Sequence, residues 1–357
     1  MEEWKTYKLG ELLNIKYGKD HKSLSDGLFP AYGSGGIMRM VEKPIYDKPS
    51  ILIPRKGSLN NIIYTDSPFW TVDTMFWTII DNDIVLPHYL YYSIKDVDFA
   101  SLNVGSAVPS LTCPIIEAIE VTIPSISIQQ KILNCIEPID EKISLNNRIN
   151  HNLEEQMISL FDELCVDIDD CIKAPLTEIA DYVNGLAMQK FPATGGEKGL
   201  PVLKIKELGQ GFFDESSDRC TSELKPDAII HDGDIVFSWS GTLLVDMWCG
   251  GIGGINQHLF KVQSNKYPKW FYYMWTKYHL ENFIHIAKDK AVTMGHIKRR
   301  HLENAIVNIP SSEALVALNK IFEPMLEQIL KIRLENRKLR EERDILLPRL
   351  MSGKLTC

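Results

Sequence analysis

The second half of this chain repeats the first half. The segment IEVTIPS at residues 119–125 recurs as AIVNIPS at residues 305–311, which is 186 positions later. The same offset relates Pro138 to Pro324 and continues through the apolar positions around them. Matching prolines, and a matching order of flanking segments, favour two copies of one structural unit over a chance likeness between two helices.

Before these segments the two copies match more loosely. LGEL at residues 9–12 corresponds to LTEI at residues 176–179 at an offset of 167, so the second copy carries 19 more residues. SILIPRKGS at residues 50–58 parallels DIVFSWSGT at residues 234–242. Short apolar runs bounded by Gly, Pro, Asp and Asn predict strands in these regions. Each copy is therefore expected to begin with a mixed α/β domain.

A heptad pattern follows the shared segment in each copy. Its positions alternate four and three residues apart, which predicts a coiled-coil seam of about five heptads. In the first copy they are Ile132, Ile136, Ile139, Ile143, Asn146, Asn150, Leu153, Met157, Leu160 and Leu164. In the second copy they are Leu318, Phe322, Met325, Ile329, Ile332, Asn336, Leu339, Arg343, Leu346 and Leu350.

Prolines and asparagines interrupt the apolar seam. Because proline removes a backbone donor, each helix is expected to kink or to start at Pro138 and Pro324. Asn150 and Asn336 occupy equivalent seam positions, where a buried asparagine costs stability but fixes the register of paired helices. The alternative is that both asparagines face solvent near a frayed stretch.

The order of elements predicts an α+β fold with an internal pseudo-twofold repeat. Residues 1–125 and 171–311 are expected to form two mixed α/β domains. Residues 126–170 and 312–357 are expected to form long helices that pair antiparallel as a two-helix coiled coil. Such a pair would both separate and join the domains as a rigid spacer.

The charge distribution limits how the chain can bind nucleic acid. A net charge of −8 argues against binding through the whole surface. Residues 126–170 hold three Lys or Arg against ten Asp or Glu, whereas residues 312–357 hold nine against seven. These opposite signs suit two helices that pair with each other. Contact with DNA through local loops remains compatible with the acidic total.

The sequence shows no motif of an active site. It has no G-x-x-x-x-G-K-[ST] loop, no H-E-x-x-H and no Asn-Pro-Pro-Tyr tetrapeptide. Its seven cysteines and nine histidines are too dispersed for the spacing of metal ligands. It also lacks a basic leader before an apolar run, and any apolar run of about 18 residues. We expect a cytoplasmic protein without catalytic residues, metal or cofactor of its own.

Candidate contacts with a polyanion lie in the predicted loops. HIKRRH at residues 296–301 places the cations of Lys298, Arg299 and Arg300 beside His296. Such a cluster can neutralise phosphates or place an arginine on guanine, although it would also suit the solvated face of a short helix. Candidates in the first domain are Lys19, Lys22, Arg39, Arg55, Lys56, Asn60 and Asn61. Further candidates in the second are Gln189, Lys204, Lys206, Ser238, Ser240, Gln257 and His258. Amides beside cations suit adenine edges, and serine hydroxyls suit phosphates.

Several segments resemble those of a known family. GSAVPSLTCPIIEAIEVTIPSISIQQKI (105–132), EPIDEKISLNNRINHNLE (137–154) and LLPRLMSGKL (346–355) resemble parts of the specificity subunits of type I restriction–modification enzymes. YGSGGI (32–37) resembles the opening of that family's recognition domains. The likeness covers essentially the whole chain.

The resemblance implies a non-catalytic subunit that recognises double-stranded DNA. Each mixed domain would read one half of a split target in the major groove, while the helices set the spacing and dock two modification subunits. Those subunits would bind S-adenosylmethionine and methylate adenine after flipping it out. A restriction subunit would add translocation and cleavage that depend on ATP and magnesium. The resemblance implies no membrane contact.

Two departures from the repeat bear on partner docking. The second copy has SSEALVAL at residues 311–318 where the first has SISIQQKI, so the paired glutamines are absent there. Arg343 stands where the first copy has Met157. We therefore expect docking faces of unequal strength. A coiled-coil adaptor without DNA specificity, or an enzyme with an unrecognised site, are the alternatives; the HIKRRH segment favours DNA.

Overall fold

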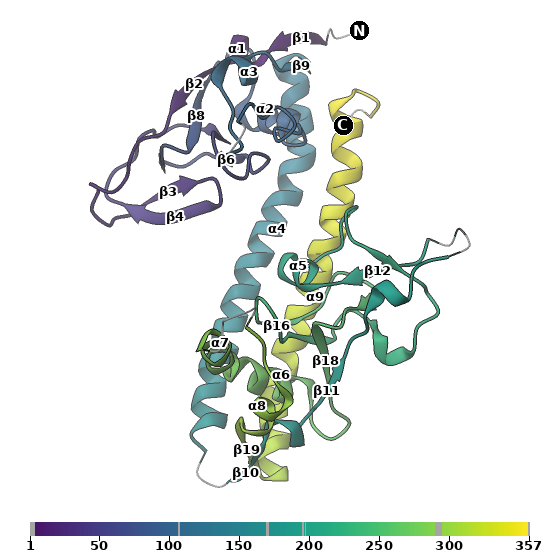
Figure 1. Cartoon of the computed structure of the whole chain (residues 1–357). Coiled ribbons are helices and arrows are strands. Elements are labelled where there is room, and N and C mark those ends of the chain that lie inside the picture. The colour runs from purple at the N-terminus through teal and green to yellow at the C-terminus, as the bar shows by residue number, and fades with distance from the viewer. Residues whose placement is uncertain are drawn as a thin grey trace. The chain divides into compact units, whose positions relative to one another are not determined.

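The computed structural model describes residues 4–105, 108–168, 171–194, 196, 198–289 and 295–355 (Figure 1). The chain divides into two compact units. Unit 1 comprises Met1–Glu141 and Glu342–Cys357, and unit 2 comprises Lys142–Glu341. Each unit therefore contains one mixed domain and parts of two long helices, α4 (Ile126–Phe161) and α9 (Ser312–Met351).

The mixed domain of unit 1 consists of short strands and three short helices. In chain order they are β1 (Lys5–Lys8), α1 (Leu9–Leu12), β2 (Leu13–Tyr17), β3 (Phe29–Gly33), β4 (Gly36–Val41), β5 (Ser50–Pro54), β6 (Ile63–Thr65), β7 (Trp70–Thr71), β8 (Met75–Ile80), α2 (Pro87–Ile94), α3 (Cys113–Glu117) and β9 (Glu120–Ile123).

The mixed domain of unit 2 has more elements among its described residues. After the π-helical turn Asp162–Val166 come β10 (Cys171–Pro175), β11 (Asp181–Asn184), β12 (Leu200–Leu203), α5 (Ile205–Gln210), β13 (Arg219–Cys220), β14 (Ile229–Ile230), β15 (Ile235–Ser238), β16 (Leu244–Met247), β17 (Gly253–Ile255), β18 (Leu259–Gln263), α6 (Lys269–Tyr278), α7 (Leu280–Asp289), α8 (Arg299–Glu303) and β19 (Ile306–Pro310). Three single 3₁₀ turns, Leu176–Glu178, Met188–Lys190 and Pro226–Ala228, lie between them.

The two domains have the same strand order in one of their sheets. The order β2-β8-β5-β6 in unit 1 corresponds to β11-β18-β15-β16 in unit 2. In each, one pair in a second sheet is parallel, β3 with β7 and β12 with β17. The first and last strands pair antiparallel in both, β1 with β9 and β10 with β19. The predicted α+β class and internal repeat are confirmed.

The cores explain why these segments form these elements. Every residue of β5 and of β15 is buried, so both are central strands with continuous apolar runs. α2 begins with Pro87 in its first turn, where the missing N–H costs no helical hydrogen bond. In α6, seven consecutive residues from Trp270 to Thr276 are buried. Burial of each large apolar side chain stabilises the fold by about 1.5–3 kcal/mol.

The heptad positions form the predicted seam. Each of them is buried or half-buried in the structure. Within unit 2, Asn146 lies opposite Asn336 and Glu154 lies opposite Arg333, so the two helices run antiparallel. Within unit 1, Asp140 accepts a 2.7 Å hydrogen bond from Arg343. The carboxylate thus neutralises the one charged seam position.

The prolines and asparagines of the seam behave differently. α4 continues through Pro138 and α9 through Pro324, so neither helix starts at its proline. Asn150 and Asn336 are both buried, at 6% and 2% exposure, and the solvent-facing alternative is wrong.

Asn336 is bonded on both sides of its amide. Its Oδ1 accepts a 2.9 Å hydrogen bond from Asn146 Nδ2, and its own Nδ2 donates one of 2.9 Å to Asn147 Oδ1. The Asn150 Oδ1, in contrast, has no partner among the described residues. A register function is therefore a better prediction for Asn336 than for Asn150.

Replacing Asn336 by alanine should lower the free energy of unfolding by about 1–3 kcal/mol, because the buried Asn146 amide loses an acceptor. Urea unfolding of the full chain measures this. The control is Lys338→Ala, an exposed position two residues further along α9. Equal stabilities of the two variants would contradict a structural role for the amide pairing.

Candidate nucleic-acid interface

One backbone arrangement occurs in both domains, where the turn after a central strand meets the loop before a short helix. In unit 1, the turn after β5 pairs with the loop before α3. Lys56 forms a bridge with Ser110, and the Leu111 N–H donates a 2.9 Å hydrogen bond to the carbonyl of Arg55. The Gly57 N–H also donates to the carbonyl of Pro109 at 3.3 Å. We name this arrangement the junction.

The junction of unit 2 has the same hydrogen bonds. Ser240 forms a bridge with His296, and the Ile297 N–H donates to the Trp239 carbonyl at 2.8 Å. The Gly241 N–H donates to the Gly295 carbonyl at 3.2 Å. The turn after β15 and the loop before α8 are therefore equivalent to the turn after β5 and the loop before α3.

In the junction of unit 1, the cations come from the strand side. The guanidinium of Arg55 lies over the ring of Tyr17, 5.6 Å from its centroid. The Tyr17 hydroxyl lies 3.6 Å from the thiol of Cys113, and this hydrogen bond raises the pKa of Tyr17. Lys56 is exposed beside Arg55. One cation is thus held by an aromatic ring, and the next is exposed to solvent.

In the junction of unit 2, the cations come from the helix side. Lys298 precedes α8, and Arg299 and Arg300 begin it. All three side chains are exposed and form no ion pair with any residue in the described ranges. The predicted candidates Ser240, Gln257, His258 and His296 lie around Trp239; the indole centroid is 6.0 Å from the His258 ring and 6.5 Å from the His296 ring.

A cavity of about 340 Å³ opens at this junction. Its lining combines an apolar floor with a cationic rim. The residues are Thr177, Tyr182, Asn184, Trp239, Phe260, His296, Ile297, Lys298, Arg299 and Leu302. This set brings three predicted residues together with aromatic ones that the analysis of loops overlooked. The parallel between residues 50–58 and 234–242 is the signal that could have identified Trp239.

Other candidates in unit 1 differ in their availability. Lys19 and Lys22 are exposed. Arg39 is occupied within the domain, since its Nη2 donates to Asp26 Oδ1 at 2.6 Å and to the Leu24 carbonyl at 3.1 Å.

The two asparagines of unit 1 are also engaged. Asn60 bonds Asp98 and the N–H of Ala100, and Asn61 donates to the Ser34 carbonyl at 2.8 Å. The structure therefore assigns Arg39, Asn60 and Asn61 internal contacts that would have to be exchanged for contacts with DNA.

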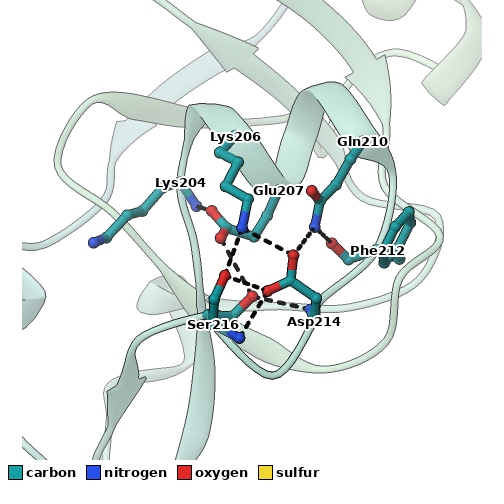
Figure 2. Close-up of polar contacts among 8 residues, drawn as sticks. Lys204, Lys206, Glu207, Gln210, Phe212, Asp214 and Ser216 are labelled. Atoms are coloured by element: carbon teal, nitrogen blue, oxygen red, sulfur yellow. Dashed lines mark hydrogen bonds and ion pairs between the residues drawn. The ribbon is translucent and has the colours of Figure 1, made fainter. Parts of the chain in front are cut away.

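Two lysines of unit 2 are also neutralised locally. Lys206 bonds Asp214 at 2.8 Å and Ser216 at 2.7 Å (Figure 2). Lys204 pairs with Asp218. The hydrogen bond from Lys206 holds the pKa of Asp214 well below its usual range. These pairs join α5 to the loop that follows it, so the lysine charges are largely compensated.

The remaining candidates of unit 2 are a buried serine and an exposed glutamine. Ser238 is fully buried, and its hydroxyl lies 2.7 Å from the Thr242 carbonyl, to which it donates. Gln189 is exposed in the 3₁₀ turn after β11. Of these two, only Gln189 is accessible to a ligand.

Two negative findings hold for the described ranges. They contain no group of three or more His, Cys, Asp or Glu side chains arranged to hold a metal ion. Among the helices described there, none is both long and apolar enough to cross a membrane.

Comparison with known proteins shows what this architecture resembles. Residues 1–155 match the family described as the type I restriction modification DNA specificity domain. This part of the chain is similar to that family. The resemblance noted in the sequence is confirmed.

Curated relatives extend the likeness beyond residue 155. The MjaIX type I restriction enzyme specificity subunit of Methanocaldococcus jannaschii is 24% identical over 343 residues, covering 87% of this chain and 78% of the relative. The HindI specificity subunit of Haemophilus influenzae is 27% identical over 237 residues, covering 59% of this chain and 50% of the relative.

A solved structure shares the fold over nearly the whole chain. It is the crystal structure of a type I restriction–modification system S subunit from M. genitalium, with a TM-score of 0.62 at 15% identity. The match covers 98% of this chain and 96% of that one. At this identity the similarity establishes the fold alone.

Replacing Arg299 and Arg300 together by alanine should weaken DNA binding by the assembled complex. If both contact phosphates, the slope of log affinity against log salt should fall by about 0.9 per lost contact. Titration of a labelled duplex at several salt concentrations measures this.

The matched control removes an ion pair without changing net charge. Lys206→Gln combined with Asp214→Asn should leave the affinity and its salt slope unchanged, because these charges already compensate each other. Equal losses in both variants would remove the α8 arginines from the interface.

Proposed function

We propose that this chain is the DNA sequence-recognition subunit of a type I restriction–modification complex and has no catalytic activity of its own. The observation that carries the proposal is the junction, repeated in both domains with exposed cations, in a chain whose first 155 residues match the specificity-domain family. Residues 1–125 would be one recognition domain and residues 171–311 the other.

The junctions suggest how the two half-sites would be read. Arginine can bond two acceptors of guanine in the major groove, and exposed lysines neutralise phosphates. In unit 1 Arg55 and Lys56 would do this, and Lys19 and Lys22 would contribute from a separate loop. In unit 2, Lys298, Arg299 and Arg300 would do so, with Gln257 and His258. Because the two junctions present different residues at equivalent positions, the two half-sites should differ in sequence and the target should be asymmetric.

Partner subunits would supply the chemistry. Two modification subunits would bind S-adenosylmethionine and methylate one adenine in each half-site after flipping it out. Restriction subunits would add cleavage that depends on ATP and magnesium. The net charge of −8 suits a surface largely covered by these proteins in the cytoplasm, with DNA affinity shared across the assembly.

Genome-wide mapping of methylated adenines, with and without this gene, tests the proposal. We expect a split motif with two different half-sites that disappears on deletion. The matched control is a strain that carries Arg299→Ala and Arg300→Ala, in which methylation of the same motif should be weakened. An unchanged methylation map after deletion would instead favour a coiled-coil adaptor without DNA specificity.

The heptad pattern makes a second prediction. Adding one heptad to each helical segment, 126–170 and 312–357, adds about 10 Å of helix, or about three base pairs of duplex. The unread gap of the methylated motif should lengthen accordingly. An unchanged gap in an active complex would show that the helices do not set the spacing.

A further inference from the structure

The β3–β4 hairpin of unit 1 exposes apolar side chains that the fold does not use. Leu28 is 85% exposed just before β3, and Ile37, Met38 and Met40 on β4 are 60%, 58% and 41% exposed. Neighbouring exposed apolar side chains of this kind indicate a surface that contacts a ligand or partner. β4 is also the edge of its sheet, in the order β4-β3-β7.

The hairpin has the shape of a projecting ribbon. Figure 1 shows β3 and β4 at the side of unit 1 away from α2. The pairing shifts register between Ala31 and Tyr32, which leaves Met38 as an extra residue on β4. At the tip, a Cβ added to Gly35 or Gly36 would meet no atom within 4 Å, so this end of the hairpin is open.

Polar contacts connect the tip of the hairpin to the junction of unit 1. The Ser34 carbonyl accepts the 2.8 Å hydrogen bond from Asn61, and a Cβ on Gly57 would lie 2.8 Å from the Ser34 hydroxyl. Gly57 follows Arg55 and Lys56 in the junction turn. The apolar strand is therefore continuous with the exposed cations of the candidate interface.

A cavity of about 540 Å³ lies beside the hairpin. Met38 and Ser34 line it together with Lys22, and so do the carboxyl-bearing Asp20 and Asp73. Because both carboxylates face this space, it does not favour a phosphate. Lys22 lines this space, and Arg55 and Lys56 precede Gly57, which lies close to Ser34 at the tip. Cations beside an exposed apolar strand are expected of a ribbon that meets base edges while neighbouring residues meet phosphates.

We infer that the β3–β4 hairpin inserts into the major groove and that Ile37 and Met40 contact the C5-methyl group of a thymine. The major groove admits a two-stranded ribbon, and the thymine methyl is the apolar group that base edges present there. This inference rests on the proposed DNA-recognition function and assigns one chemical contact to the first domain.

Among the residues of the second domain that the structure describes, no equivalent ribbon is found. After β12 the chain forms α5, and β12 pairs instead with the two-residue strand β13. The loop after α5 is tied to it by the Lys206–Asp214 pair (Figure 2). The thymine contact should therefore belong to one half-site only.

Substituting deoxyuridine for thymine removes the methyl group and keeps the base pair. With the methylated motif known, each thymine of both half-sites is replaced in turn, and adenine methylation by the assembled complex is measured. We expect one or more positions in a single half-site to lose about fourfold in kcat/KM, the effect of leaving one methyl-sized contact unmade.

The variant Ile37→Thr with Met40→Thr should then treat thymine and deoxyuridine alike. Both positions are exposed, so the fold should persist. Each single variant separately measures how much its own side chain contributes to the discrimination. The matched control is Ile79→Thr on β8, 38% exposed in the same unit, which should discriminate as the unchanged chain does.

Three results would overturn the inference. The first is that deoxyuridine changes kcat/KM at no position. The second is that the double variant still discriminates thymine from deoxyuridine. The third is that the double variant no longer binds the modification subunits. The last would show that the hairpin docks a protein. A split methylated motif would persist in the first two cases, so failure of this contact is distinguishable from failure of the proposed function.

Discussion

Two arginines of α9 hold the strand hairpin that carries the junction of unit 2. Arg333 donates to Asp246 and to the Met247 carbonyl, at 2.8 and 2.9 Å, and pairs with Glu154 of α4 at 2.7 Å. Arg337 donates to Asp232 and to the Cys249 carbonyl, both at 2.8 Å. These contacts fix the base of the β15–β16 hairpin, whose opposite end carries Trp239 and Ser240. The helix pair thereby positions Trp239 and Ser240, the strand side of the junction.

Unit 1 anchors its domain with different chemistry. The amide of Gln129, fully buried near the start of α4, accepts from the Leu86 N–H at 2.8 Å and donates to the carbonyls of Ile84 and Pro124. Asp140 accepts from both Tyr92 and Arg343. Gln129 and Arg343, which the sequence analysis connected with partner docking, therefore stabilise the unit from within. The second copy has no glutamine equivalent to Gln129, and the first copy has no arginine equivalent to Arg343. The two copies are therefore anchored internally by different residues.

The long-range pattern of the fold could be predicted, whereas the state of individual side chains could not. The seam follows from the 3.5-residue repeat that paired helices of a coiled coil require, and the duplicated strands follow from short apolar runs bounded by turn residues. The pairing of Arg39 with Asp26, or of Lys204 with Asp218, joins residues that are 13 and 14 positions apart, at least one of them in a loop. Such pairs depend on loop geometry that no periodicity encodes. Ser238 is the last residue of β15, and its burial was missed because the sequence does not show where this strand ends and the turn begins.

The comparison of the two junctions explains how one fold can carry two specificities. The carbonyls of Arg55 and Trp239 accept equivalent backbone hydrogen bonds, so the two junctions have the same backbone arrangement although their side chains differ. In unit 1 the arginine extends from the strand and is held over Tyr17, whereas in unit 2 an indole occupies that place and the arginines begin α8. Moving the cation from strand to helix shifts the position at which a base edge or phosphate can be met. Because the backbone does not depend on which side supplies the charge, the junction can vary without disturbing the helix anchors.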